Sequence, residues 1–132
     1  NEDAAQKMFE YADEIYQAFD EFSEYPIALA YLAYFDAKKQ EMVSARQRIR
    51  KALALCDRFL SPWWKGVTIY MMWKIRADFG DRQDIGELAD LWPGSEEEHC
   101  EWCLSYLHQI EWREETQQIE QELQKLHQGA PA

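Results

Sequence analysis

The stretch YPIALAYLAYF, residues 25–35, decides the fold class of this chain. All eleven of its residues are apolar or aromatic, and a helix that is apolar on every side is typical of the centre of a protein. The run falls short of the roughly 18 apolar residues that a membrane span requires. We therefore predict a buried helix over residues 26–40 and no association with a membrane. Pro26 suits the start of such a helix, because its missing N–H costs nothing there.

The segments on either side of this stretch carry apolar residues at helical spacing. Met8, Tyr11 and Ile15 recur at intervals of three and four before it, and a similar stripe follows in residues 45–60. Glycine and proline are sparse, at 5 and 4 of 132 residues, and alternation at period two is never sustained. We predict one all-α domain, residues 1–132, formed by a bundle or array of five or six helices. The expected helices cover residues 3–22, 26–40, 44–60, 62–79, 84–92 and 95–127.

Local signals mark several helix ends. Glu98 follows Ser95 at the spacing of a capping box, in which the two side chains satisfy each other's backbone donors. Ser44 and Gln47 have the same spacing and predict a helix start at Ser44. Gly80 is expected to end a helix in the left-handed conformation. Trp-Pro-Gly at residues 92–94 predicts a turn.

The C-terminal segment is expected to form one long helix. No glycine or proline interrupts residues 95–127, and these 33 residues would span about 50 Å at 1.5 Å per residue. Such a helix outruns a domain of this size and needs a packing partner. Its second half has the spacing of a coiled-coil seam, and we predict that this seam forms a homodimer. The seam residues are Trp112, Ile119, Leu123 and Leu126.

Charge is sorted into three blocks along the chain. Residues 1–24 carry a net charge of −7, residues 36–76 carry +7 and residues 77–132 carry −11, which together give the net charge of −11. The basic block either packs against the acidic ends or stays exposed to bind an anion. A sequence pI of about 4.6 does not fit a nucleic-acid-binding domain, so direct nucleic-acid binding is not expected. The candidate basic face comprises Arg46, Arg48, Arg50, Lys51 and Arg58.

The cysteines and histidines give a weak candidate metal site at His99, Cys100 and Cys103. Structural zinc sites draw four ligands from two separated pairs, and only one pair is present here. We therefore expect no metal and no cofactor, with Cys103 in the core and His99 on the surface. The cysteines number three, an odd count that fits a reducing, cytoplasmic location better than a disulfide framework.

No pattern in the sequence indicates catalysis. A nucleophile elbow, a phosphate-binding loop and a dinucleotide-binding glycine motif are all missing from it. Histidines number only three, which leaves few general bases. We predict that the chain is not an enzyme.

An aromatic cluster is the main candidate binding site. The consecutive residues Met71, Met72 and Trp73 cannot all point to one side of a helix, which favours a partly open groove over a closed core. A tightly packed core and a pocket for a small apolar ligand stay open as alternatives. The candidate groove residues are Tyr31, Tyr34, Trp63, Trp64, Tyr70, Met71 and Trp73.

These observations predict a non-enzymatic helical module that binds a protein partner and associates with itself through its C-terminal helix. One alternative is the ligand-sensing and dimerisation domain of a bacterial regulator, with a small apolar ligand in the aromatic cluster. A second alternative is an acidic mimic of nucleic acid that inhibits another protein. Because the chain begins at Asn1 rather than at Met, a missing upstream segment is also left open. Nothing in the sequence identifies the partner.

Overall fold

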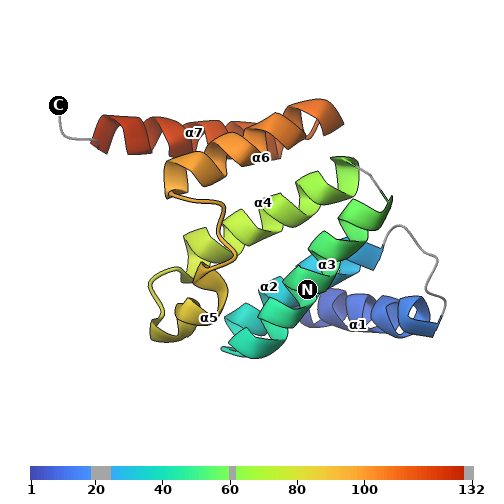
Figure 1. Cartoon of the computed structure of the whole chain (residues 1–132). Helices are drawn as coiled ribbons and strands as arrows, with labels where there is room; N and C mark the ends of the chain where they lie inside the picture. Colours follow the sequence, from blue (N-terminus) through green and yellow to red (C-terminus); the bar gives the residue numbers. More distant parts are fainter. Residues whose placement is uncertain (19–24, 60–61, 130–132) are drawn as a thin grey trace.

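A computed structural model of the chain describes residues 1–18, 25–59 and 62–129 (Figure 1). In these ranges it holds seven α-helices, one 3₁₀ turn and no strand, so the all-α prediction is confirmed and the helix count exceeds the expected five or six. The helices are α1 (Glu2–Ala18), α2 (Tyr25–Lys38), α3 (Met42–Phe59), α4 (Pro62–Phe79), α5 (Gly86–Ala89), α6 (Glu96–Ile110) and α7 (Arg113–Gly129), with the 3₁₀ turn at Gln83–Ile85 before α5.

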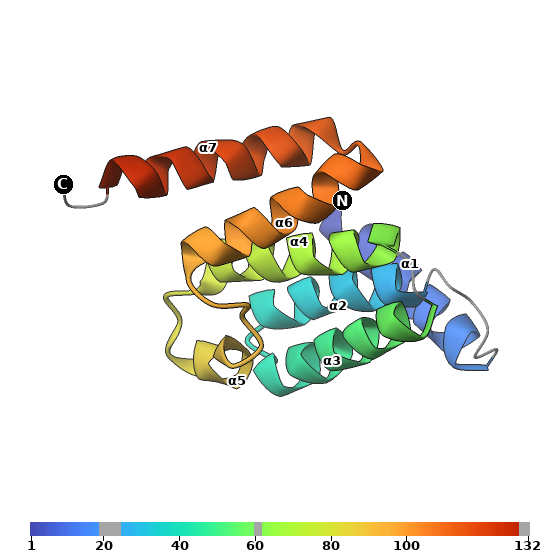
Figure 2. The same ribbon diagram turned by 45° about the horizontal axis from the view of Figure 1, so that its top comes forward.

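Helices α2 and α4 form the centre of the molecule. Helix α2 packs against α1, α3 and α4, and α4 packs in turn against α2, α3 and α6. Figure 2 shows these helices side by side, with α6 and α7 on one side of α4 and α3 on the other. Ala30, Leu32 and Ala33 of α2 are 0% exposed, as a helix that is apolar all round requires. The prediction of a buried central helix is confirmed.

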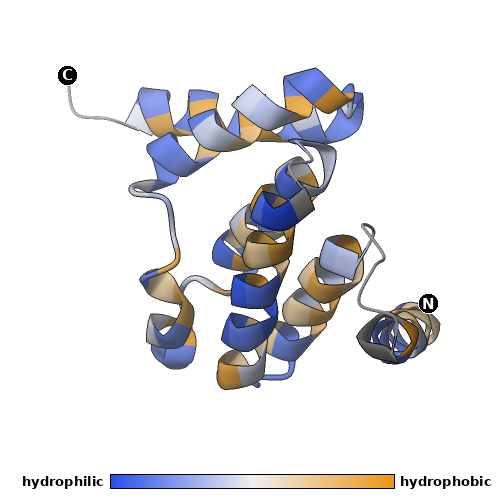
Figure 3. Cartoon of the chain, turned by 45° about the vertical axis from the view of Figure 1, so that its right-hand side comes forward, coloured by the Kyte–Doolittle hydropathy of each residue, from blue (hydrophilic) through white to orange (hydrophobic). Residues whose placement is uncertain are grey.

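Two hydrophobic cores lie on opposite sides of α4. Met71 belongs to the core that α4 shares with α6 and α7, where it joins Leu107 and Ile119. Met72 belongs to the core that α4 shares with α2, α3 and α5, where it joins Ile49. Adjacent methionines therefore point in different directions and are both buried. Figure 3 shows the corresponding pattern of hydropathy, with hydrophilic residues on the outer faces of α3 and α7.

The expected long C-terminal helix is instead two helices. Helix α6 ends at Ile110, Glu111 has a left-handed φ of 59°, and α7 begins at Arg113. Helix α7 therefore has only 17 residues, and Figure 2 shows it folded back along α6. A left-handed residue other than glycine costs about 1–2 kcal/mol. Burial of the fully covered Ile119, worth about 1.5–3 kcal/mol, offsets that cost. The turn contains no glycine or proline, so the pattern gave no sign of it.

The helix α6 starts as predicted. The backbone N–H of Glu98 donates to Ser95 Oγ at 3.1 Å, and the backbone N–H of Ser95 donates to Glu98 Oε1 at 3.2 Å. The capping box is thus complete. The turn before it is confirmed as well, because Gly94 has a φ of 90°.

One other predicted boundary and one predicted cap are wrong. Helix α3 begins at Met42, and the Ser44 hydroxyl donates to Asp36 Oδ2 at 2.9 Å instead of capping a helix. Helix α4 ends at Phe79 as expected, but Gly80 is not a left-handed cap, because among the glycines that the structure describes Gly94 is the one with a positive φ. The expected end of the first helix, at residue 22, lies outside the described residues. No described helix has both the length and the apolar character that crossing a membrane would demand.

Candidate functional site

The structure separates the seven candidate groove residues into a buried set and an accessible set. Tyr70, Met71 and Trp73 are 7%, 2% and 6% exposed, so they belong mainly to the core between α4 and its neighbours. Tyr31 and Tyr34 of α2 are half-buried at the surface. The two tryptophans at the start of α4 lie apart from them, where Trp63 packs edge-on against Trp64 and Trp112. The accessible parts of the predicted groove are Trp63, which is 37% exposed, and the tyrosine edge formed by Tyr31 and Tyr34.

A surface pocket lies at this edge, between the start of α1 and helices α2 and α4. Its volume is about 300 Å³. The ring of Phe9 from α1 stacks on Tyr31 with centroids 4.8 Å apart, which fixes one wall. The structure thus brings together three of the predicted residues. The lining residues are Asn1, Glu2, Ala5, Tyr31, Tyr34, Phe35, Met71 and Lys74.

Charged groups hold the Tyr34 side of this pocket. The Tyr34 hydroxyl donates to Asp78 Oδ2 at 2.6 Å. The Lys74 ammonium lies 5.2 Å from the centroid of the Tyr34 ring, a cation–π distance. Burial raises the pKa of Tyr34, and the hydrogen bond to Asp78 raises it further. The phenol is therefore a neutral hydrogen-bond donor at physiological pH.

Helix α7 forms the opposite edge of the site. The Tyr70 hydroxyl donates to Gln118 Oε1 at 2.8 Å, and the Tyr70 ring meets Trp112 edge-on at 6.3 Å. Glu115 lies between these two contacts on α7 and is half-buried. Burial raises the pKa of Tyr70 to about 12, with the Glu115 charge as the second cause. The same two causes raise the pKa of Tyr31. Glu115 therefore acts on both phenols.

We call this surface the tyrosine face, and it has an acidic character. Its carboxylates come from three helices: Glu2 from α1, Asp78 from α4 and Glu115 from α7. Phenol rings beside carboxylates favour a positively charged group that carries an apolar stem. The tyrosine face comprises Tyr31, Tyr34, Tyr70, Lys74, Asp78 and Glu115, with the pocket at its α1 side.

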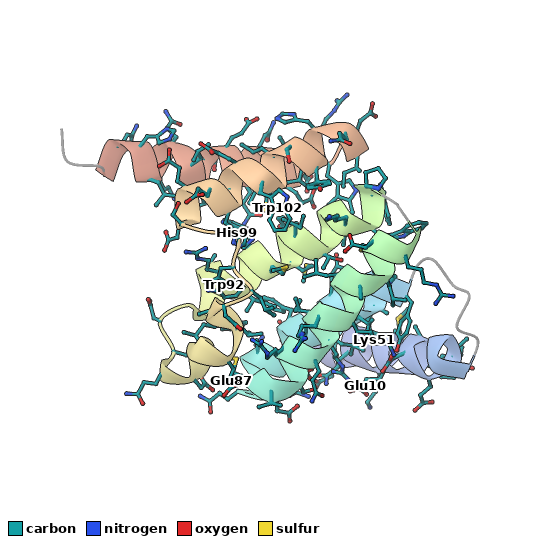
Figure 4. The ribbon with its side chains drawn as sticks, in the orientation of Figure 1. Glu10, Lys51, Glu87, Trp92, His99 and Trp102 are labelled. Atoms are coloured by element: carbon teal, nitrogen blue, oxygen red, sulfur yellow. The ribbon has the colours of Figure 1, made fainter. Side chains whose placement is uncertain are left out.

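Most of the predicted basic face of α3 is engaged within the chain. Arg46 makes a two-point ion pair with Asp90, and its second contact is 2.8 Å long. Arg48 pairs with the buried Asp36 at 2.7 Å. Figure 4 shows Lys51 on the side of α3 that faces α1, where its ammonium donates to the Tyr25 hydroxyl at 3.1 Å. Arg50 and Arg58 are exposed, and Arg58 also has a partner.

Two of the ion pairs join the basic middle of the chain to its acidic ends. Lys38 pairs with Glu2 near the N-terminus, and Arg46 pairs with Asp90 in the last block. The first of the two alternatives for the basic block, internal packing against acidic residues, therefore holds for these side chains.

The weak metal candidate is a buried structural cluster. His99 is 0% exposed, contrary to the expected surface position, and its Nε2 lies 3.4 Å from the carbonyl oxygen of Ile69. Its ring packs against Trp92 with centroids 6.0 Å apart, as the labelled side chains in Figure 4 indicate. Burial lowers the pKa of His99 to about 4. Cys103 is in the core as predicted, and burial raises the pKa of its thiol. In the described ranges no three His, Cys, Asp or Glu side chains are placed to hold a metal ion.

The predicted dimer seam packs inside the chain. Ile119 is 0% exposed in the core between α4, α6 and α7. Trp112, Leu123 and Leu126 are half-buried against the same core. The stripe that predicted self-association therefore packs in part against the core of its own chain.

Sequence reasoning missed Lys74, Asp78 and Glu115. Each is one of many charged residues in the sequence, and no motif around it indicates a binding site. The spacing of Trp112, Glu115 and Gln118 would have placed Glu115 on this surface only if α7 were already known to face α4.

No family model matches the chain, and neither a curated protein nor a solved structure shows significant similarity to it. The geometry of the tyrosine face is therefore the basis for a functional assignment.

Proposed function

We propose that this chain is a non-enzymatic helical interaction module that binds a basic segment of a protein partner on its tyrosine face. The observation that carries the proposal is a surface pocket of about 300 Å³ lined by half-buried tyrosines and flanked by carboxylates. Tyrosine is enriched in protein interfaces because it offers a large apolar ring and one hydrogen-bonding group. A net charge of −11 also attracts cationic partners over a distance.

The protonation of the tyrosines supports binding rather than catalysis. The pKa values of Tyr31 and Tyr70 are raised by burial and by the Glu115 charge, and that of Tyr34 is raised by burial and by Asp78. All three phenols therefore stay protonated at neutral pH. The Tyr34 and Tyr70 hydroxyls already donate to Asp78 and Gln118, so the half-buried Tyr31 is the phenol that can donate to a bound segment. A phenolate nucleophile or base would need a lowered pKa instead.

The alternative of an enclosed pocket for a small apolar ligand has less support. Of the side chains that would line it, Tyr70 and Trp73 are packed into the core, and Met71, which borders the surface pocket, is only 2% exposed. The pocket that exists carries Glu2 and Lys74 on its lining, which suits a ligand with charge as well as apolar surface. We place the module in a reducing compartment, because its three cysteines are free and buried.

Binding to a basic peptide tests the proposal. The probe is a fluorescein-labelled dodecapeptide of four Leu-Arg-Gly repeats, and the readout is its fluorescence anisotropy on titration with the full chain. We expect Tyr31→Ala to weaken binding about fivefold, because an aromatic contact contributes about 1 kcal/mol. Backbone NMR shifts caused by the peptide should fall on α2, α4 and α7.

Tyr11→Ala is the matched control. Tyr11 is a tyrosine on the outer surface of α1, 67% exposed, and lies outside the tyrosine face. Its replacement should leave the affinity unchanged, and circular dichroism should show that both variants are folded. If the peptide fails to bind, or if the two variants bind it equally, the proposal is wrong.

A further inference from the structure

We propose that Glu115, together with Tyr31 and Tyr70, forms a cation subsite that receives one arginine or lysine side chain of the partner segment. This inference rests on the proposed function and names the chemistry of the contact at its centre. It commits the tyrosine face to a basic peptide rather than to an acidic or purely apolar one.

The position of Glu115 follows from the way α7 packs. Residues three apart on a helix lie on neighbouring positions of one face. Trp112 and Gln118 flank Glu115 at this spacing, and both contact Tyr70, one through its ring at 6.3 Å and the other through its hydroxyl at 2.8 Å. Ile119 anchors the same helix in the core. This spacing places Glu115 on the face of α7 that meets Tyr70, and the Glu115 charge also raises the pKa of Tyr31.

Glu115 lacks the partner that comparable acidic residues have. Glu2 pairs with Lys38, Asp36 with Arg48 and Asp90 with Arg46. Within residues 1–18, 25–59 and 62–129, no cationic side chain lies within 4.0 Å of the Glu115 carboxylate. A half-buried carboxylate without a cation has lost part of its hydration and has gained no ion pair in return. A bound arginine or lysine would supply that pair.

Lys74 indicates that this surface accepts a cation. Its ammonium lies over the Tyr34 ring at 5.2 Å, and in the described part of the chain its partner is this ring rather than a carboxylate. The tyrosine face thus already holds one alkylammonium group by a cation–π contact. On the Glu115 side, a guest cation would find the half-buried ring of Tyr31 and an unpaired carboxylate as well.

A pair of adjacent glutamates provides a closely matched test. Glu114 and Glu115 are both in the first turn of α7, so Glu→Gln at either position changes the net charge and the helix dipole interaction equally. Glu114 is exposed, whereas Glu115 is half-buried at the phenols. Each variant is titrated with the Leu-Arg-Gly dodecapeptide and with the same peptide carrying citrulline, an uncharged isostere, in place of arginine.

We expect Glu115→Gln to weaken binding of the arginine peptide about fivefold, as loss of one ion pair with a cation–π contact implies. Binding of the citrulline peptide should stay the same. Glu114→Gln should change either affinity by less than about twofold, which is the general effect of one remote charge. As a readout without ligand, Glu115→Gln should lower the pKa of Tyr70 in a ¹³C-tyrosine NMR titration, and Glu114→Gln should not.

The results of these titrations distinguish failure of the cation subsite from failure of the proposed peptide-binding function. If Tyr31→Ala weakens peptide binding but the two glutamate variants behave alike, the subsite is wrong and the function stands. The subsite is equally wrong if the wild-type chain binds the arginine and citrulline peptides with the same affinity. Spermidine that competes at the peptide's own affinity would assign the face to free polyamines and overturn the peptide partner. Failure of the wild-type chain to bind the arginine peptide would remove both proposals.

Discussion

The outer face of α3 and the tyrosine face both carry charge, but they use it differently. On α3, Arg46 and Arg48 each have a carboxylate partner, and the Lys51 ammonium lies over the Tyr25 ring at 4.7 Å. On the tyrosine face, Glu115 has no cation in the described residues, and Lys74 is held by a ring alone. Four of the five basic side chains of α3 thus have partners within the chain, and Arg50 is exposed. Availability for a partner depends on pairing in the fold and not on local charge density.

Removal of the Ile119 side chain, which anchors α7, should have the largest effect on the tyrosine face. Ile119→Ala deletes a side chain that is 0% exposed in the core shared with α4 and α6. We expect the free energy of unfolding to fall by about 3 kcal/mol, as for other large-to-small core changes, and peptide binding to weaken because α7 carries Glu115. Urea denaturation followed by circular dichroism measures the first effect. Glu120→Ala, an exposed neighbour on α7, should change stability by less than about 0.5 kcal/mol.

Acid should lower the free energy of unfolding by a similar amount through His99, which lies on one side of α4. His99 lies on the α6 side, and burial holds its pKa at about 4 against an ordinary value of 6.5. The unfolded chain therefore binds one more proton than the folded chain between these pH values, and the stability due to neutral His99 is lost as pH falls from about 6.5 to about 4. The loss approaches about 3 kcal/mol, at about 1.4 kcal/mol per pH unit.

The His99→Gln variant isolates this contribution from the titration of carboxylates. Urea unfolding at several values between pH 7 and pH 4 should give a steeper loss of stability for the wild-type chain than for the variant. Parallel curves for the two proteins would show that His99 is not the group responsible.

The smallest expected effect is on the affinity for the arginine peptide when the charge of Lys74 is removed. Lys74→Met keeps the length of the side chain but removes a positive charge from the tyrosine face. We expect it to strengthen binding of the arginine peptide about threefold, because the guest cation no longer meets a like charge and can also use the Tyr34 ring.

The control for this variant is Lys125→Met, which removes a lysine from the exposed surface of α7 that pairs only with Glu122 in the described residues. It should leave the affinity within about 1.5-fold of the wild type, since exposed charges are screened by salt. Equal effects of the two substitutions would mean that Lys74 acts only through the net charge.

Local patterns predicted the helices whose environment is uniform. Helix α2 is apolar all round and lies at the centre, and the Ser95 capping box starts α6 as its two side chains dictate. The site was predicted in part: Tyr31 and Tyr34 are accessible, whereas Met71 and Trp73 are not. An apolar stripe has the same pattern whether a partner chain or the same chain covers it.

The break between α6 and α7 could not be predicted for a related reason. Glu111 takes a left-handed conformation without any local preference for it, because tertiary packing of Ile119 compensates for the cost. The burial of His99 is likewise a tertiary effect, since α6 turns its first-turn histidine toward Trp92 and the Ile69 carbonyl. Neither the capping box nor the three preceding glutamates indicates that direction.

The position of adjacent residues of α4 in two cores has a consequence for how the molecule melts. Met71 belongs to one core and Met72 to the other, so α4 cannot lose its packing on one side while it keeps its place on the other. Cooperative unfolding arises when separate clusters share a rigid element in this way. We expect tryptophan fluorescence, which reports mainly on the α6 and α7 side, and circular dichroism, which reports on all helices, to follow a single coincident transition.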